Sequence, residues 1–120
     1  MANILLVEGY ANLASLYRTV LTEEGHNVLV ASDSSNAINL AHTFAIELVI
    51  LDEGLADRDE ERLLNILKNI QPRIKSIICS FDEFTPAALY HLCDDGFIKT
   101  ADYTILQRKI NQLIKGPVKH

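Results

Sequence analysis

Two short runs of purely aliphatic residues in this sequence are each followed directly by an acidic residue. Residues 4–7 (ILLV) are followed by Glu8, and residues 48–51 (LVIL) are followed by Asp52. A strand carries continuous Val, Ile and Leu when both of its faces are buried, as in a parallel sheet. Because ligands bind outside the carboxyl ends of such strands, we expect the two acids to meet in one crevice.

Aliphatic runs alternate along the chain with stretches of helical periodicity. Strands are predicted at residues 3–7, 27–31, 47–51, 73–80 and 97–98. Helical spacing of apolar residues follows each of them, at residues 13–21, 37–45, 63–70, from Pro86 to Leu92, and at 105–114. The pattern predicts an α/β fold, a doubly wound parallel sheet of five βα units with helices on both faces. The flavodoxin-like strand order 2-1-3-4-5 is expected.

Composition restricts the class of protein. A chain of 120 residues with 48% hydrophobic residues has the size and apolar content of one globular domain. Its net charge of −5 argues against nucleic acid or an anionic membrane as a partner. The sequence shows neither an apolar stretch of spanning length nor a signal peptide, so a cytoplasmic protein is expected. Cys79 and Cys93 lack metal-ligand spacing and are interpreted as reduced thiols.

Five segments in order carry a resemblance to a known family. They are NILLVEGY, EEGHNVLVASD, ELVILD, IICSF and GFIKT. With them, the chain resembles a receiver domain of two-component response regulators over nearly its whole length. The resemblance implies the flavodoxin-like fold already expected from the strand pattern. It also implies one receiver domain at residues 1–116, followed by a tail at 117–120.

The resemblance also implies roles for individual residues. Asp52 is expected to accept a phosphoryl group, with Ser80 and Lys99 contacting that group. Glu8, Asp52 and the backbone carbonyl of Gly54 are expected to bind Mg²⁺. The chemistry is consistent, because a divalent cation removes the repulsion between a carboxylate and an anionic phosphoryl group. A lysine and a hydroxyl then stabilise the developing charge.

The implied partners follow from the same resemblance. A histidine kinase or a phosphotransfer protein is expected to supply the phosphoryl group. An output domain or partner protein is expected at the face formed by the fourth helix, the fifth strand and the last helix. Dimerisation through the last two βα units is left open. No enzymatic activity is expected beyond self-phosphorylation and slow autodephosphorylation.

Four parts of the sequence depart from the family pattern: residue 9, residue 81, the region around Lys99, and the loop at residues 55–61. Gly9 stands where the family has a second acid, and the loss of that carboxylate should cost about 1–3 kcal/mol of Mg²⁺ binding. Phe81 is expected to narrow access to Asp52, and Thr100 replaces the usual proline after Lys99. The switch aromatic of the family would fall near Phe97, which has no hydroxyl. A further hypothesis is that Arg58 substitutes a guanidinium for the missing cation; an acidic first helical turn is the simpler interpretation of that loop.

Two functional hypotheses therefore remain. The first is a signalling receiver that is phosphorylated on Asp52 with weakly bound Mg²⁺. The second is a pseudo-receiver, a protein-interaction module that is not phosphorylated because Gly9 leaves the Mg²⁺ site incomplete. A flavodoxin-like cofactor binder is disfavoured, because no glycine-rich or hydroxyl-rich phosphate loop follows the first strand, where Gly9 stands alone. No nucleophile–base pair indicates a stand-alone enzyme.

Overall fold

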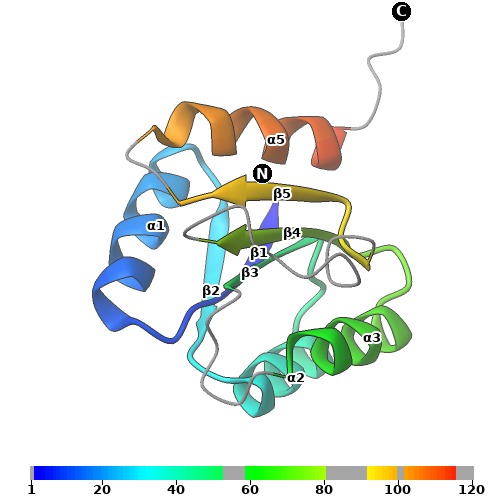
Figure 1. Cartoon of the computed structure of the whole chain (residues 1–120). Coiled ribbons are helices and arrows are strands. Elements are labelled where there is room, and N and C mark those ends of the chain that lie inside the picture. The colour runs from blue at the N-terminus through cyan, green and yellow to red at the C-terminus, as the bar shows by residue number, and fades with distance from the viewer. Residues whose placement is uncertain (1, 53–58, 81–91, 100–101, 116–120) are drawn as a thin grey trace, which may run out of the picture.

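A five-stranded parallel sheet forms the centre of the molecule, in the order β2-β1-β3-β4-β5 (Figure 1). The computed structural model describes residues 2–52, 59–80, 92–99 and 102–115. The strands are β1 Asn3–Val7, β2 Asn27–Ala31, β3 Leu48–Asp52, β4 Lys75–Ser80 and β5 Asp95–Ile98. The helices are α1 Ala11–Glu23, α2 Ser34–Thr43, α3 Glu60–Ile70 and α5 Tyr103–Lys115. The predicted fold class and strand order are confirmed.

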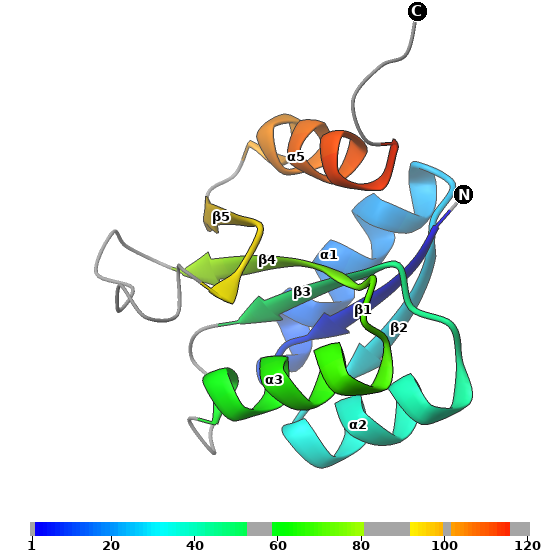
Figure 2. The same ribbon diagram turned by 90° about the vertical axis from the view of Figure 1, so that its right-hand side faces the viewer.

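Helices cover both faces of the sheet, with α1 and α5 on one face and α2 and α3 on the other (Figure 2). Successive residues of a strand point to opposite faces. In β1, Leu5 and Val7 therefore pack toward α2 and α3, while Ile4 and Leu6 pack toward α1 and α5. This two-sided burial explains why the central strands carry uninterrupted aliphatic residues.

Local signals set several element boundaries. Asp33 caps α2, because its Oδ1 accepts a hydrogen bond of 2.8 Å from the backbone N–H of Asn36. Gly25 follows α1 with φ of 90°, a conformation that glycine adopts without steric cost. The strand β5 begins at Asp95, two residues before the predicted start. The helix expected from Pro86 to Leu92 lies outside the described residues except for Leu92, and the predicted tail lies outside them as well.

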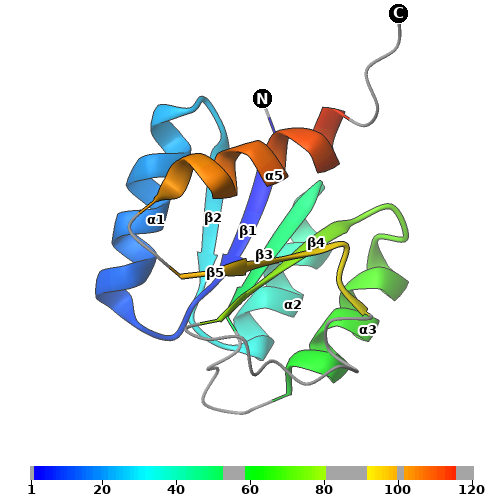
Figure 3. The same cartoon turned by 45° about the horizontal axis from the view of Figure 1, so that its top comes forward.

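The register of the sheet brings the carboxyl ends of four strands to one edge. Val7 lies beside Leu51, Asp52 beside Cys79, and Ser80 beside Ile98. Figure 3 shows these strands from the side covered by α5. Residues that end β1, β3, β4 and β5, or directly follow them, are therefore held in a common region. None of the described helices is long and apolar enough to cross a membrane.

Candidate functional site

Three charged side chains meet at the carboxyl edge of the sheet. The Lys99 Nζ donates hydrogen bonds to Glu8 Oε1 at 3.3 Å and to Glu8 Oε2 at 3.2 Å. The same ammonium also donates a hydrogen bond to Asp52 Oδ1. The side chains of Glu8, Asp52 and Lys99 are 1%, 3% and 3% exposed. We call this group the acid pocket, and it brings together three of the site residues expected from the sequence.

Backbone hydrogen bonds fix the positions from which these side chains project. The N–H of Glu8 donates to the carbonyl of Ala31 at 3.0 Å, which extends the pairing of β1 with β2 by one residue. The N–H of Lys99 donates to the carbonyl of Ser80 at 2.6 Å. Asp52 is the last residue of β3 and pairs with Cys79 of β4. Each charged side chain is therefore anchored to the sheet rather than to a free loop.

Two carboxylates share one ammonium, so the fully ionised acid pocket carries a net negative charge. Burial raises the pKa of Glu8, and the nearby charge of Asp52 raises it further, while Lys99 opposes the rise; the resulting pKa is about 7. The acid pocket is therefore expected to take up a proton near neutral pH.

This proton uptake should make stability depend on pH. The pKa of Glu8 rises from 4.5 in a model compound to about 7 in the folded protein, so between these values the folded state binds more protons. The free energy of unfolding should therefore increase as the pH falls from about 7 to about 5. Urea unfolding across this range measures the slope. Glu8→Gln, which cannot ionise, should flatten the profile, and an unchanged slope in that variant would contradict the assignment.

One oxygen of the acid pocket lacks a partner. Asp52 Oδ2 is buried and forms no hydrogen bond with the described residues, although Oδ1 of the same carboxylate is held by Lys99. A buried polar atom without a partner costs free energy and calls for an explanation in terms of function. An incoming phosphoryl group, a cation or the proton held by Glu8 would satisfy this oxygen.

The described residues offer Mg²⁺ a minimal set of ligands. Glu8 and Asp52 supply two carboxylates, and Mg²⁺ is commonly bound through one or two carboxylates together with phosphate and water. The described residues contain no cluster of three or more His, Cys, Asp or Glu side chains suited to a metal. The carbonyl expected from Gly54 lies outside the described residues. The two carboxylates are donors of the kind that Mg²⁺ prefers.

Gly9 lies exposed directly after Glu8, with room for a larger side chain. A Cβ atom at this position would meet no atom nearer than the carbonyl oxygen of Ser32, at 3.9 Å. A hollow of about 300 Å³ lies alongside, between α1 and β2, and Arg18 and Val30 contribute to its lining. The space around residue 9 would therefore accommodate an acidic side chain, although the sequence has glycine there.

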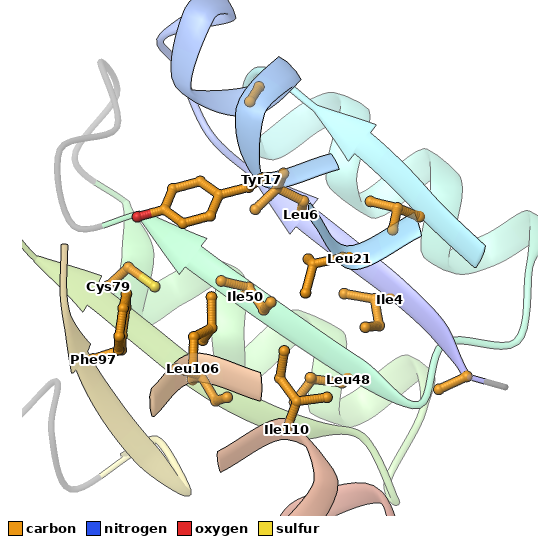
Figure 4. Close-up of a cluster of buried hydrophobic side chains, with 14 residues drawn as sticks. Ile4, Leu6, Tyr17, Leu21, Leu48, Ile50, Cys79, Phe97, Leu106 and Ile110 are labelled. Carbon is orange, nitrogen blue, oxygen red and sulfur yellow. The ribbon is translucent and has the colours of Figure 1, made fainter. Parts of the chain in front are cut away.

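Of the other residues expected at or near the site, the structure describes only some. Ser80 is 2% exposed at the end of β4, beside the backbone of Lys99. Phe97 is 3% exposed and packs in the core between the sheet and α5 (Figure 4). Phe81, Arg58 and Thr100 lie outside the described residues. The roles assigned to these residues stay predictions.

Sequence reasoning missed Tyr17 as a site residue. Its spacing predicts only a place in the apolar stripe of α1, and the structure does bury it to 3% exposure. Its hydroxyl, however, is directed toward the carboxyl end of β3 (Figure 4). A tyrosine in place of an aliphatic residue within a buried stripe was the available signal.

Comparison with known proteins identifies the fold. No protein-family model and no curated protein matches the sequence. The solved structure of response regulator protein TrrA from Thermotoga maritima, in complex with Mg²⁺–BeF, superposes with a TM-score of 0.86 at 21% identity, covering 94% of this chain and 99% of that chain. A two-component response regulator from Clostridium difficile gives a TM-score of 0.87 at 19% identity, covering 97% and 98%.

A third structure adds a metal-bound example. The receiver domain of a sensor histidine kinase from Pseudomonas aeruginosa PAO1, with magnesium coordinated in its active-site cleft, gives a TM-score of 0.86 at 18% identity, covering 96% of this chain and 98% of that chain. The likeness to these structures establishes the architecture of the chain. This chain has the fold of response regulator receiver domains.

Proposed function

We propose that this protein is a signalling receiver of the two-component type, in which Asp52 accepts a phosphoryl group. One observation carries the proposal: the buried Asp52 carboxylate ends the central strand β3, with one oxygen held by Lys99 and the other without a partner among the described residues. The shared fold supports it, since similar structures include receivers with Mg²⁺–BeF or magnesium bound.

Each residue at the site would have a separate role in phosphoryl transfer. Lys99 orients the Asp52 carboxylate and neutralises part of its charge, which lowers the repulsion toward an anionic donor. The Ser80 side chain lies at the neighbouring strand end, where a hydroxyl can donate to the transferred group. Mg²⁺ would be held by Glu8 and Asp52, with the carbonyl of Gly54 as a further ligand, and would supply charge neutralisation between carboxylate and phosphoryl oxygens.

The proposed reaction is a transfer between two proteins. An Asp52 oxygen forms a bond to phosphorus while the bond from phosphorus to a nitrogen of the donor phosphohistidine breaks. The donor ring is protonated on its other nitrogen, so the electron pair of the broken bond stays on the ring and the histidine leaves as neutral imidazole. The donor is a histidine kinase or a phosphotransfer protein. The acyl phosphate then alters contacts with an output domain or partner protein that involve β5 and α5.

Incubation with a small phosphodonor and Mg²⁺, followed by intact mass measurement, tests the proposal. An adduct of about 80 Da, the mass of one phosphoryl group, is expected in the natural sequence and should disappear in Asp52→Ala. Ser80→Ala is the matched control, because it removes a proposed contact but leaves the acceptor, so it should slow the adduct without abolishing it. An adduct that persists in Asp52→Ala would refute the assignment.

A second candidate is a pseudo-receiver that works through constant protein contacts. Lys99 already holds both acids of the pocket, and residue 9 has no carboxylate to recruit a metal. Such a protein should show no adduct under forcing concentrations of phosphodonor and Mg²⁺. Its partner binding should also be the same in the natural sequence and in Asp52→Asn, whereas binding to the partner of a working receiver should change with the phosphodonor.

A further inference from the structure

The Tyr17 side chain lies between the carboxyl end of β3 and the first turn of α5. It projects from α1 into the core between the sheet and α5, where Leu6, Cys79 and Leu106 also lie (Figure 4). The Tyr17 ring meets the Tyr103 ring edge to face, with centroids 5.4 Å apart and planes at 88°. This arrangement is a favourable one for two aromatic rings and fixes their relative orientation.

The Tyr17 hydroxyl lies within the electric field of the charged side chains of the acid pocket. Burial raises the pKa of the Tyr17 phenol above its ordinary value, and Cys79, Tyr103, Glu8 and Asp52 raise it further. The phenol therefore stays protonated at neutral pH and acts as a neutral dipole. A protonated hydroxyl is a donor, and its orientation depends on the negative charge nearby.

The first turn of α5 is well placed to respond to a change in the orientation of the Tyr17 hydroxyl. Tyr103 is the first residue of α5, and only three residues separate it from Lys99 in the sequence. Farther along the helix, Lys109 Nζ bonds to Asp95 Oδ1 at 3.0 Å, which ties the helix to the start of β5. Ile110 is fully buried on the same helix. The middle of α5 is thus anchored, while its first turn packs through Leu106, which is 0% exposed, and through the contact of Tyr103 with Tyr17.

We propose that Tyr17 is a positioning residue that transmits a change of charge in the acid pocket to the first turn of α5 through its contact with Tyr103. A change at Asp52 alters the field at the Tyr17 hydroxyl, and the ring passes the resulting adjustment to Tyr103. An adjustment of this turn would change the protein surface, because Ile105 on the same turn of α5 is 41% exposed. The signalling meaning of this contact rests on the proposed function, but the contact can be tested without phosphorylation.

Nuclear magnetic resonance of the full chain labelled with ¹³C at tyrosine Cζ provides the test. The protein contains four tyrosines and no tryptophan, so single Tyr→Phe variants assign every resonance. Asp52→Asn removes one charge from the pocket with almost no change of shape. We expect this substitution to shift the Cζ resonances of both Tyr17 and Tyr103.

The conservative variant Tyr17→Phe then separates transmission from simple packing. It keeps the ring and removes the hydroxyl, so the Tyr103 shift caused by Asp52→Asn should be largely lost. Tyr10→Phe is the matched control, since Tyr10 directly precedes α1 at its pocket end but is 58% exposed, and it should leave the Tyr103 response intact. A Tyr103 resonance that ignores Asp52→Asn, or that responds equally in Tyr17→Phe, would overturn the proposal.

A second arm distinguishes this inference from the proposed function. Beryllofluoride with Mg²⁺, the combination bound in the Thermotoga maritima structure, should shift the same two resonances if Asp52 accepts a phosphoryl group. If beryllofluoride with Mg²⁺ shifts neither resonance while Asp52→Asn shifts both, the result counts against phosphorylation of Asp52. The contact between Tyr17 and Tyr103 would still be supported.

Discussion

Lys99→Met is expected to lower the free energy of unfolding by about 3–5 kcal/mol, the cost typical of removing one partner from a buried ion pair. The substitution keeps most of the side-chain volume but removes the only ammonium that contacts Glu8 and Asp52 among the described residues. Two carboxylates, 1% and 3% exposed, would then repel each other with no counter-charge from the described part of the chain. Equilibrium urea unfolding at neutral pH measures the loss.

A lysine of α5 provides the matched control for this substitution. Lys109 pairs with Asp95 at 3.0 Å, but these side chains are 29% and 33% exposed. Lys109→Met should therefore cost less than about 1 kcal/mol. The loss in Lys99→Met should shrink as the pH falls, because protonation relieves the repulsion between Glu8 and Asp52. Equal losses in the two variants, or a loss in Lys99→Met that is independent of pH, would show that Lys99 does not neutralise a buried acid pair.

Gly9→Asp is expected to raise the affinity for Mg²⁺ by roughly 5- to 150-fold, since a contact with a charged group contributes about 1–3 kcal/mol. The backbone tolerates the new side chain, because a Cβ at residue 9 meets its nearest neighbour, the Ser32 carbonyl oxygen, at 3.9 Å. The added carboxylate would join Glu8 and Asp52 at the same edge of the sheet. Calorimetric titration with Mg²⁺ measures the change in affinity.

Gly9→Asn separates the charge from the bulk of the new side chain. Asparagine has the same shape but no negative charge, so its gain in Mg²⁺ affinity should be much smaller. Without Mg²⁺, Gly9→Asp should also destabilise the protein more than Gly9→Asn, because it adds a third carboxylate around a single ammonium. If both variants bind Mg²⁺ as weakly as the natural sequence does, residue 9 is not the cause of the incomplete site.

The strand order and the positions of Glu8 and Asp52 could be predicted from the sequence. Both acids directly follow continuous aliphatic runs, and parallel strands bring their carboxyl ends to one edge. The start of β5 could not be predicted, because Asp95 and Gly96 give no apolar signal and are held by pairing with Ile77 and Ile78 of β4.

The hydrogen bonds inside the acid pocket could not be predicted from the sequence either. Lys99 reaches Glu8 across 91 positions of the chain, and the direction of its side chain depends on how β5 packs against β4. The resemblance implied only that Lys99 would contact a phosphoryl group. Similarly, the periodicity of α1 places Tyr17 on the buried face, but the direction of its hydroxyl depends on the packing of α5.

Residue-level mass spectrometry after treatment with a phosphodonor and Mg²⁺ tests whether Asp52 is the phosphoryl acceptor, as we claim. Gly9→Asp should be included beside the natural sequence, because a completed metal site should accept a phosphoryl group even where the natural one reacts slowly. We expect the adduct on Asp52 in both proteins, faster in Gly9→Asp, and none when Asp52→Asn is added to either. No adduct in Gly9→Asp, or an adduct that survives Asp52→Asn, would contradict the claim.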